Sequence, residues 1–505
     1  MCNFCKLSII ENINKFLSPK NLLIICLFLC VISVCCYVLF FIDINRDTAN
    51  VYAYYAREFG NGNFKDAILT KVPMLNILLG GGLSYLGMDS LKALCLVAGL
   101  FFLASVFPLY YLLKRYVSPV MAAYGCLLYI TVPRLIKNYN APLLESGRAF
   151  FLLAAILYFF KTLEEQKIKN AILLGLSVGL LATARGEGLI ITFLLLFVYL
   201  IYALIIKKIG SIKKHILLLL IAIVSTFVAL SPFCALNYAK SGYFVTDARI
   251  VGTIKSIHKR IVKTDKNKQV ESEKKFINYY TLPEEKYTLS HMISSCIKGG
   301  YLPYWIFAII GLVLIIKEKR WNKDYFLLFT IAVIQNIVYF ITITSSRYFL
   351  YMIPLFMIFT ITGVDFLRTL TEKYVQKKFC NYIIYLCLIV LVFEFCYGLK
   401  SAFSRNEIKY KKVGEWIETY NKKHFPNRRL ILFAPMMSEV AYWSKAINTE
   451  RYENPRHNPK DFKDFDLAVV SAKRHYNMKT RNDLELIPNT PHCKSIWIFK
   501  VKKDK

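Results

Sequence analysis

Charged residues at the ends of long apolar runs are the ones whose types and positions could support chemistry at a membrane. Asp43, Arg46 and Asp47 follow the first apolar run. An acid at a membrane surface is a place for chemistry on a lipid, although the same residues fit an ordinary interfacial loop with solvated acids. The segment after them predicts an amphipathic helix that contains Tyr55 and ends at the glycine-rich turn 60–62.

A second group of such residues lies in the stretch PRLIKNYNAPLLESGR, which starts at residue 133. Lys137 and Arg148 fit an interfacial anchor, in which long basic side chains reach from apolar surroundings to water. Glu145 fits an anchor less well, because an unpaired carboxylate at the start of an apolar run is costly. This stretch is therefore a second candidate site.

Two further motifs carry charge between apolar runs. Arg185 and Glu187 stand in the turn ATARGEG, either as a local ion pair that contributes little or as charges that face a cavity. Arg347 and Tyr348 open a late apolar run. The planar fork of a guanidinium suits a phosphate, but an arginine in this position also fits a simple interfacial anchor.

The elements that would position these residues are membrane-spanning helices. The chain has 505 residues, of which 56% are hydrophobic and 15% aromatic, and about 20 apolar residues cross a hydrocarbon core. A chain with many such runs is an α-helical polytopic membrane protein, since in lipid each backbone polar group must be satisfied within a helix. We predict eleven spans, near residues 20–42, 91–113, 117–134, 147–161, 169–184, 187–206, 213–236, 301–317, 325–344, 348–367 and 380–399.

The distribution of basic residues predicts the orientation. With the N-terminus in the cytoplasm, every short inner loop is rich in lysine and arginine, as the positive-inside rule requires. The apolar segment 73–87 must then be a re-entrant or interfacial helix, because counting it as a span would invert the later loops. The net charge of +32 suits anionic head groups. Nucleic-acid binding is a poor explanation of this charge, and we expect no nucleic-acid partner, because the basic residues are dispersed and no nucleic-acid motif occurs.

We predict two domains. Residues 1–400 form the membrane domain, which has a first outer loop at 43–90 and a large outer loop at 237–300. Residues 401–505 form a small extracytoplasmic α/β domain, in which the pattern predicts a helix, a strand, a helix and two more strands. Most of the fourteen cysteines lie in spans, and no disulfide framework is predicted.

Several of these pieces occur together in one known pattern. The pieces are Arg46-Asp47 with VYAYYAREFGNGNF, Pro73, Lys114-Arg115, Leu144-Glu145-Ser146, the turn 184–188, Arg347-Tyr348 with Pro354, and AYWS at 441–444. With them the chain resembles the GT-C superfamily of glycosyltransferases. Within that superfamily it is similar to the family of dolichyl-phosphate-mannose protein mannosyltransferases and aminoarabinose (lipid A) transferases. The resemblance covers nearly the whole chain.

The resemblance implies an inverting transfer of a sugar from a polyprenyl-phosphate donor to a lipid, glycan or protein acceptor at the outer face. Asp47 would be the catalytic base, and Glu145 would orient the acceptor or share that role. The substrate-binding residues would be Arg46, Tyr55, Lys137, Arg148, Arg185, Glu187, Arg347 and Tyr348. No cofactor is expected. A divalent metal stays open but is unsupported, because Thr48 stands where the family often has a second acid.

Two other classes share these features. A lipid-linked sugar transporter or flippase would also combine many spans with buried charge, but it would more often show internal repeats and broken helices in mid-membrane. A glycan polymerase or ligase would use the same donor and a large outer loop, such as 237–300. In each case we expect a multi-pass protein of the cell (inner or cytoplasmic) membrane with its C-terminal domain outside.

Overall fold

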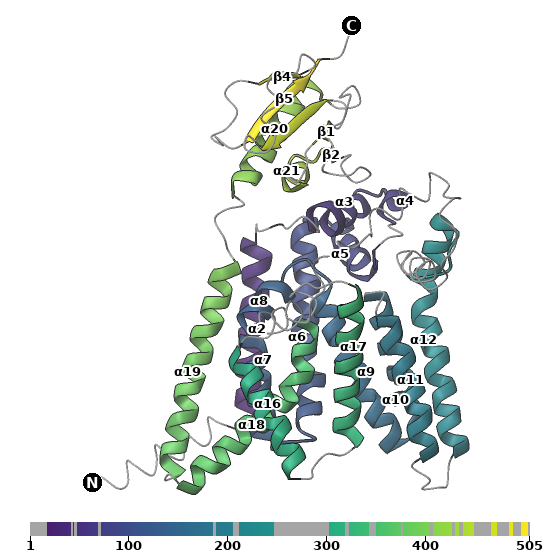
Figure 1. Cartoon of the computed structure of the whole chain (residues 1–505). Coiled ribbons are helices and arrows are strands. Elements are labelled where there is room, and N and C mark those ends of the chain that lie inside the picture. The colour runs from purple at the N-terminus through teal and green to yellow at the C-terminus, as the bar shows by residue number, and fades with distance from the viewer. Residues whose placement is uncertain are drawn as a thin grey trace, which may run out of the picture. The chain divides into compact units, whose positions relative to one another are not determined.

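The computed structural model divides into two compact units (Figure 1). The residues it describes are 18–41, 44, 48–68, 72–184, 188–205, 212–246, 302–318, 323–342, 350–374, 377–402, 408–426, 430–433, 438–448, 466–471, 484–487 and 496–502. Unit 1 comprises residues 1–39, 68–79 and 95–402, and unit 2 comprises residues 40–67, 80–94 and 403–505. The first outer loop is therefore grouped mainly with the C-terminal residues, whereas the sequence-based boundaries assign it to the membrane domain.

All eleven predicted spans coincide with helices, because apolar runs of this length can satisfy their backbone groups only as helices. The helices are α2 (Pro19–Phe40), α6 (Ser90–Leu113), α7 (Pro119–Thr131), α9 (Glu145–Glu165), α10 (Ile168–Ala184), α11 (Gly188–Ile205), α12 (Ile212–Ser241), α16 (Leu302–Lys317), α17 (Lys323–Thr342), α18 (Ile353–Tyr374) and α19 (Lys377–Ala402). A short helix, α8 (Pro133–Tyr139), follows α7 at a bend of 66°.

Within the described residues, five helical segments are long and apolar enough to cross a membrane. They are α2, α6, α9, α12 and Leu350–Tyr374, and the bent pair of α7 and α8 would make a sixth. The remaining apolar helices are shorter. A multi-pass membrane protein is thereby confirmed, while the count of eleven spans stays a prediction. Helix α5 (Leu75–Tyr85) has 11 residues, about half of what a span needs, and this fits the interfacial helix expected at 73–87.

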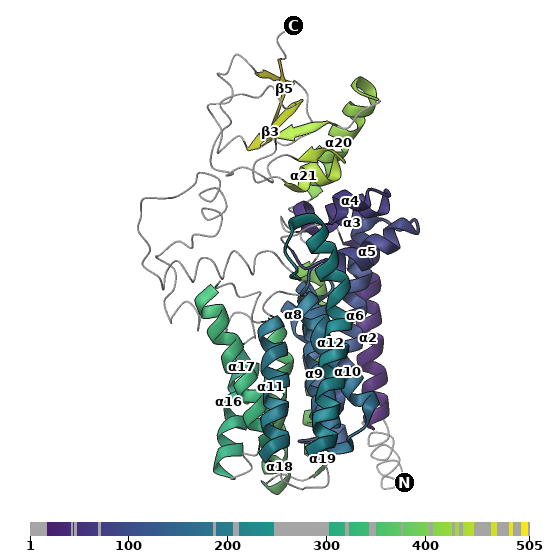
Figure 2. The same cartoon turned by 90° about the vertical axis from the view of Figure 1, so that its right-hand side faces the viewer.

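The helices of unit 1 approach each other most closely where one of them carries glycine. Figure 2 shows α9, α10 and α12 lying together. Gly175 and Gly179 of α10 face the backbone of α12, and Thr226 Oγ1 donates to the Gly175 carbonyl at 3.2 Å. On the opposite side, Gly311 of α16 faces Gly363 of α18. Small residues of this kind let membrane helices pack backbone to backbone.

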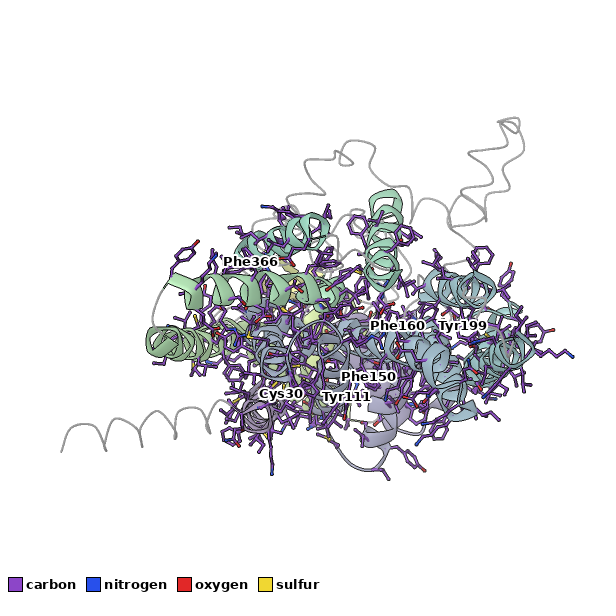
Figure 3. The ribbon with its side chains drawn as sticks, turned by 90° about the horizontal axis from the view of Figure 1, so that it is seen from below. Cys30, Tyr111, Phe150, Phe160, Tyr199 and Phe366 are labelled. Carbon is purple, nitrogen blue, oxygen red and sulfur yellow. The ribbon has the colours of Figure 1, made fainter. Side chains whose placement is uncertain are left out.

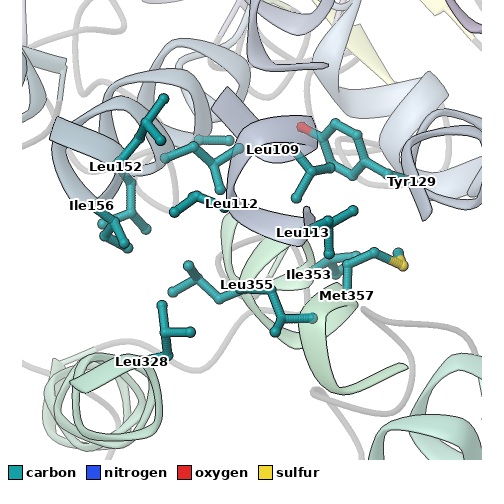
Figure 4. Packing of buried hydrophobic residues seen from close by; sticks show 14 of the residues in the cluster. Leu109, Leu112, Leu113, Tyr129, Leu152, Ile156, Leu328, Ile353, Leu355 and Met357 are labelled. Carbon is teal, nitrogen blue, oxygen red and sulfur yellow. The ribbon is translucent and has the colours of Figure 1, made fainter. Parts of the chain in front are cut away.

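The core of unit 1 is formed by α6, α7, α9 and the segment that leads into α18. Leu109, Leu112 and Leu113 of α6 lie between Leu152 and Ile156 of α9 on one side and Ile353 and Leu355 of α18 on another, with Tyr129 of α7 beside Leu109 (Figure 4). In the view from below, Phe160 and Tyr199 lie on the same side of the bundle (Figure 3), where the rings of Phe159 and Tyr199 are 5.8 Å apart. Most of α9 is buried, whereas most of α12 faces outward. Helix α9 is therefore a central helix of the unit.

An ionic contact fixes the C-terminal end of α9. Arg115, which follows α6, donates from Nη2 to Asp324 Oδ2 at 2.9 Å and from Nη1 to Glu164 Oε2 at 2.9 Å. Burial alone would lower the pKa of Arg115, but hydrogen bonds to the two carboxylates outweigh it and raise that pKa. The guanidinium therefore stays charged and joins α6, α9 and α17.

Unit 2 contains the short helices of the first outer loop and the C-terminal domain, here called the tail domain (residues 403–505). The loop begins with a π-helix, η1 (Thr48–Tyr52), followed by α3 (Ala53–Gly60) and α4 (Phe64–Ala67). Helix α3 ends at Gly60, and Gly62 takes a left-handed φ of 82°. The predicted amphipathic helix and its glycine turn are thus present.

The tail domain is a small α/β domain, as predicted from the order of its elements. It contains α20 (Ile408–His424), β1 (Ile431–Phe433), α21 (Ser438–Trp443), β2 (Ile447–Asn448), β3 (Leu467–Ser471), β4 (Leu484–Leu486) and β5 (Ile496–Val501). The sheet order is β2-β1-β3-β5-β4, parallel from β2 to β3 and antiparallel from β3 to β4. Strands β2 and β4 were not predicted.

Candidate functional site

Two ionisable side chains are buried at the beginning of α9. Glu145 and Arg148 expose 3% and 1% of their surface, although burying a charge is costly unless it is paired or hydrogen-bonded. Glu145 lies in the first turn of α9, where the helix dipole favours a negative charge. An acid and a base kept inside an apolar bundle mark this helix end as a functional candidate.

Aromatic side chains enclose the guanidinium. The Arg148 Cζ atom lies 3.6 Å from the centre of the Tyr351 ring, and Tyr351 is itself 1% exposed. The Tyr139 hydroxyl donates to the Leu350 carbonyl at 3.0 Å, so α8 is tied to the segment before α18. Glu145 lies one helical turn before Arg148 on α9, and Tyr351 directly follows Leu350 in the chain. These four side chains therefore belong to one site.

Two amides and a hydroxyl complete the set. Asn76 Nδ2 of α5 donates to the Leu143 carbonyl at 2.8 Å, and Asn140 Nδ2 donates to Ser33 Oγ at 2.8 Å. Asn76 lies beside the first turn of α9, since a Cβ built at Gly147 would be 3.4 Å from Asn76 Oδ1, an ordinary van der Waals distance. We call the whole set the buried polar cluster: Asn76, Tyr139, Asn140, Glu145, Ser146, Arg148 and Tyr351.

The cluster still has hydrogen-bonding capacity. Asn76 Oδ1, Asn140 Oδ1 and Ser146 Oγ are buried and have no hydrogen-bond partner among the described residues. Buried polar atoms in proteins almost always have a protein or water partner. The two amide oxygens can each accept a hydrogen bond, and the Ser146 hydroxyl can accept or donate one.

Of the sequence-predicted site residues that the structure describes, Glu145 and Arg148 lie in this cluster. Lys137 lies on the exposed side of α8, although its carbonyl accepts from the Tyr37 hydroxyl at 3.2 Å. Tyr55 is buried in unit 2, where its ring meets that of Tyr54 edge-on. Six candidates lie outside the described residues: Arg46, Asp47, Arg185, Glu187, Arg347 and Tyr348.

Sequence reasoning missed two members of the cluster. Asn76 is a lone amide in the apolar segment MLNILLG, and an amide inside such a segment already suggests a function. Tyr351 follows Arg347 by four residues in RYFLYMIP, which places it on the same helical face if the segment is helical. Tyr139, Asn140 and Ser146 stand inside the predicted motif, but only the fold shows that their side chains turn inward.

The described residues contain no group of three His, Cys, Asp or Glu side chains placed to hold a metal ion. Asp43 and Asp47, the acids in question for a metal, are outside those residues. A divalent metal therefore stays open and unsupported, as expected from the sequence.

Comparison with known families tests the fold. A family model described as dolichyl-phosphate-mannose-protein mannosyltransferase matches residues 70–233, which include every member of the buried polar cluster except Tyr351. No curated protein matches the chain. Among solved structures, ArnT from Cupriavidus metallidurans in the apo state matches with a TM-score of 0.67 at 12% identity, over 95% of this chain and 98% of that chain. The chain therefore has the GT-C fold.

Other GT-C structures match as well. ArnT from the same organism bound to undecaprenyl phosphate gives a TM-score of 0.64 at 12% identity, over 95% of this chain and 97% of that chain. The oligosaccharyltransferase AglB from Archaeoglobus fulgidus, in complex with an inhibitory peptide and a dolichol-phosphate, gives 0.53 at 10% identity, over 85% and 64%.

These findings confirm the predicted GT-C fold. Identities of 10–12% show the fold and leave the sugar donor and the acceptor to further argument. The family model covers the beginning of α9, where Glu145 and Arg148 lie. Most of the buried polar cluster is therefore in the part of the chain that matches this family.

Proposed function

We propose that this GT-C protein transfers a sugar from a polyprenyl-phosphate donor to a hydroxyl of a lipid, glycan or protein acceptor at the outer face of the cell membrane. The observation that carries the proposal is the burial of Glu145 and Arg148 at one helix end in the segment that matches the mannosyltransferase family. Neither charge is needed to hold an apolar bundle together, and both suit the two ends of a glycosyl phosphate.

The reaction would be a single displacement at the anomeric carbon. The acceptor oxygen forms the new bond to that carbon, the bond between the carbon and the phosphate oxygen breaks, and the configuration inverts. The acceptor proton goes to a carboxylate, since a general base must accept it. The lipid phosphate leaves with the bonding electrons, so positive groups must stabilise its growing charge.

Asp47 is the proposed base, because it stands at the family's position for the required acid. Glu145, in the buried polar cluster, would orient the acceptor or share the proton. Arg148 would bind the phosphate with its fork of N–H donors, and Arg185 and Arg347 are proposed for the same group. The titles of the matched structures name undecaprenyl phosphate in ArnT and a dolichol-phosphate in AglB, which supports a lipid-phosphate donor.

The decisive experiment uses the purified full-length chain in lipid nanodiscs with a panel of polyprenyl-phosphate sugars and candidate acceptors. Release of free polyprenyl phosphate that depends on the acceptor, followed by mass spectrometry, would support transfer. A flippase would move the intact donor across a proteoliposome bilayer without releasing phosphate. A polymerase or ligase would yield products with several added units, so that product length distinguishes the third class.

A matched pair of variants tests the site within the same helix. Glu145→Gln removes a buried charge at the beginning of α9, and Glu164→Gln removes an exposed charge in its last turn. We expect Glu145→Gln to lower kcat strongly and Glu164→Gln to leave it close to that of the wild type. Equal activity of both variants would remove Glu145 from the mechanism.

A further inference from the structure

A contact within unit 2 joins two parts of the chain that are 385 residues apart. The Arg57 Nη1 atom of α3 donates to the Tyr442 carbonyl of α21 at 2.8 Å. The same guanidinium lies 5.0 Å from the centre of the Tyr442 ring and 5.4 Å from that of Tyr54. A charged donor on a backbone carbonyl is one of the stronger hydrogen bonds, and the two rings restrict the guanidinium further.

The Tyr442 side chain makes a second polar contact. Its hydroxyl lies 3.0 Å from Ser90 Oγ at the beginning of α6, and both residues are buried, with 5% and 3% exposed. A buried hydroxyl pair is costly to break, because the remaining group loses its partner. Tyr442 therefore contacts the first loop through its backbone, its ring and its hydroxyl.

Apolar side chains surround these polar contacts. Tyr442 packs in a cluster with residues of the first loop and of early α6, namely Ile44, Ala49, Ala53, Ala56, Leu91 and Leu94. Tyr52 and Trp443 lie at its margin. The alanines of η1 and α3 form a smooth face on which α21 rests.

Helix α21 is itself held firmly in the tail domain. Gly414 of α20 packs against Trp443 and against the Val440 carbonyl, leaving no room for a Cβ. Lys411 of the same helix lies over the Trp443 ring at 4.9 Å. A restraint on α21 is therefore transmitted to α20 and the sheet.

Helix α3 needs such support. It has 8 residues, fewer than the roughly 12–15 that an isolated helix needs in water, and its N-cap has no side-chain hydrogen bond. The π-helix η1 precedes it and begins at Thr48, one residue after the proposed base Asp47. Single-turn π segments are frequent at functional sites. Whatever holds η1 and α3 therefore holds the segment that begins one residue after the proposed base.

We propose that Arg57 and Tyr442 are positioning residues, and that this Arg57–Tyr442 clamp lets the tail domain hold the loop that carries the catalytic base. The contact between Arg57 and Tyr442 does not depend on the proposed function. Its effect on turnover does, because that effect requires Asp47 to act as the base. A misplacement of about 1 Å in a catalytic group can cost on the order of 10²-fold in rate.

The test compares variants of the full-length chain in nanodiscs. Arg57→Ala removes the guanidinium, Arg57→Lys restores a single charged donor, and Tyr442→Phe and Ser90→Ala each remove one side of the hydroxyl pair. Tyr420→Phe is the matched control, because it removes a tyrosine hydroxyl of the tail domain on α20, away from the clamp. Hydrogen exchange of the α3 amides and donor-dependent turnover are measured for each variant.

For Arg57→Ala we expect amide exchange in α3 to rise about 10- to 100-fold, the equivalent of one charged hydrogen bond. We expect kcat to fall about 10- to 100-fold with an unchanged KM for the donor, and partial rescue by Arg57→Lys. Tyr442→Phe and Ser90→Ala should each raise amide exchange in α3, and the double variant should show less than the sum of the two effects, because both substitutions delete the same hydrogen bond.

Each arm has its own contradicting result. Unchanged exchange in Arg57→Ala, or additive effects of Tyr442→Phe and Ser90→Ala, would show that no clamp exists. If Arg57→Ala shows faster exchange of the α3 amides but a normal kcat, the clamp stabilises the fold without positioning the base, and its positioning role is overturned. If the wild-type protein shows no transfer at all, the proposed function fails, while the exchange arm still decides whether the clamp exists.

Discussion

The guanidinium carbon of Arg148 lies 3.6 Å from the centre of the Tyr351 ring, and both side chains are almost fully buried. This stacking joins the first turn of α9 to the segment that leads into α18. A desolvated pair of this kind contributes about 2 kcal/mol. It also leaves the edges of the guanidinium, where the N–H donors lie, directed away from the ring.

The first prediction concerns this stacking. Tyr351→Leu removes the aromatic face and should lower both the Tm and the rate of sugar transfer, because Arg148 loses the group that orients it. Tyr351→Phe keeps the ring and should retain most of both. Thermal unfolding in detergent and the transfer assay measure the difference. Indistinguishable Leu and Phe variants would show that the ring does not orient Arg148.

The second prediction concerns the base. Asp47→Asn keeps the shape of the side chain and removes the proton acceptor. It should lower kcat by about 10²- to 10⁴-fold, the usual contribution of a positioned base, and leave donor binding intact. Asp43→Asn, four residues earlier, is the control. Loss of activity in Asp43→Asn together with normal turnover in Asp47→Asn would reverse the assignment.

The third prediction concerns the packing of α16 on α18. A Cβ at Gly311 would overlap the Phe359 carbonyl oxygen, so Gly311→Ala should destabilise the protein by about 1–3 kcal/mol, as overpacking does. Gly82→Ala in α5 is the control, because nothing lies within 4 Å of a Cβ there. Alanine at that helical position should be neutral or slightly stabilising. Thermal unfolding of both variants decides whether the contact is as tight as described.

The fourth prediction concerns the tail domain at acid pH. Burial would raise the pKa of Glu418, but hydrogen bonds from Lys445 and Lys422 outweigh burial and lower it. A carboxyl whose pKa is depressed by folding stabilises above its unfolded pKa, and that contribution is lost as the pH falls below about 4.5. Glu418→Gln should therefore lower the Tm slightly at pH 7, by the equivalent of ~0.2–1 kcal/mol, and the difference should shrink as the pH is lowered below 4.5. A difference that does not shrink with falling pH would contradict the ionic explanation.

The fifth prediction concerns topology. With the N-terminus in the cytoplasm, a label that cannot cross the membrane should react with cysteines placed at Lys240 and Lys505 from outside and at Lys114 only from inside. Reporter fusions at the same positions give an independent reading. A cytoplasmic Lys505 would place the tail domain on the wrong side for the proposed reaction.

The helices could be predicted because a long apolar run in lipid satisfies its backbone hydrogen bonds by forming a helix. The predicted span 147–161 became α9 at Glu145–Glu165, so Glu145 starts a helix instead of preceding one. The predicted span 117–134 instead ends in a second helix, because Pro133 begins α8 at an angle to α7. In the tail domain β2 and β4 escaped prediction, since strands of two and three residues carry no alternating pattern.

The site could be predicted only in part, because its contacts are distant in the sequence. Glu145 and Arg148 were recognisable as charges at the edge of an apolar run. Lys137 shares that edge, yet α8 turns it outward while it turns Tyr139 inward. A one-dimensional pattern of this length does not show which face of a seven-residue helix meets the core. Tyr351 was missed because its partner, Arg148, is far away in the sequence, on α9.

The contact between Arg57 and Tyr442 has a consequence for biosynthesis. The ribosome adds about 5–20 residues per second, so roughly 20–80 s pass between the synthesis of α3 and that of its partner 385 residues later. Every apolar helix from α5 to α19 is made within that interval. The first loop can reach its final packing only after Tyr442 has been made, so a prematurely terminated chain would insert its helices without this contact.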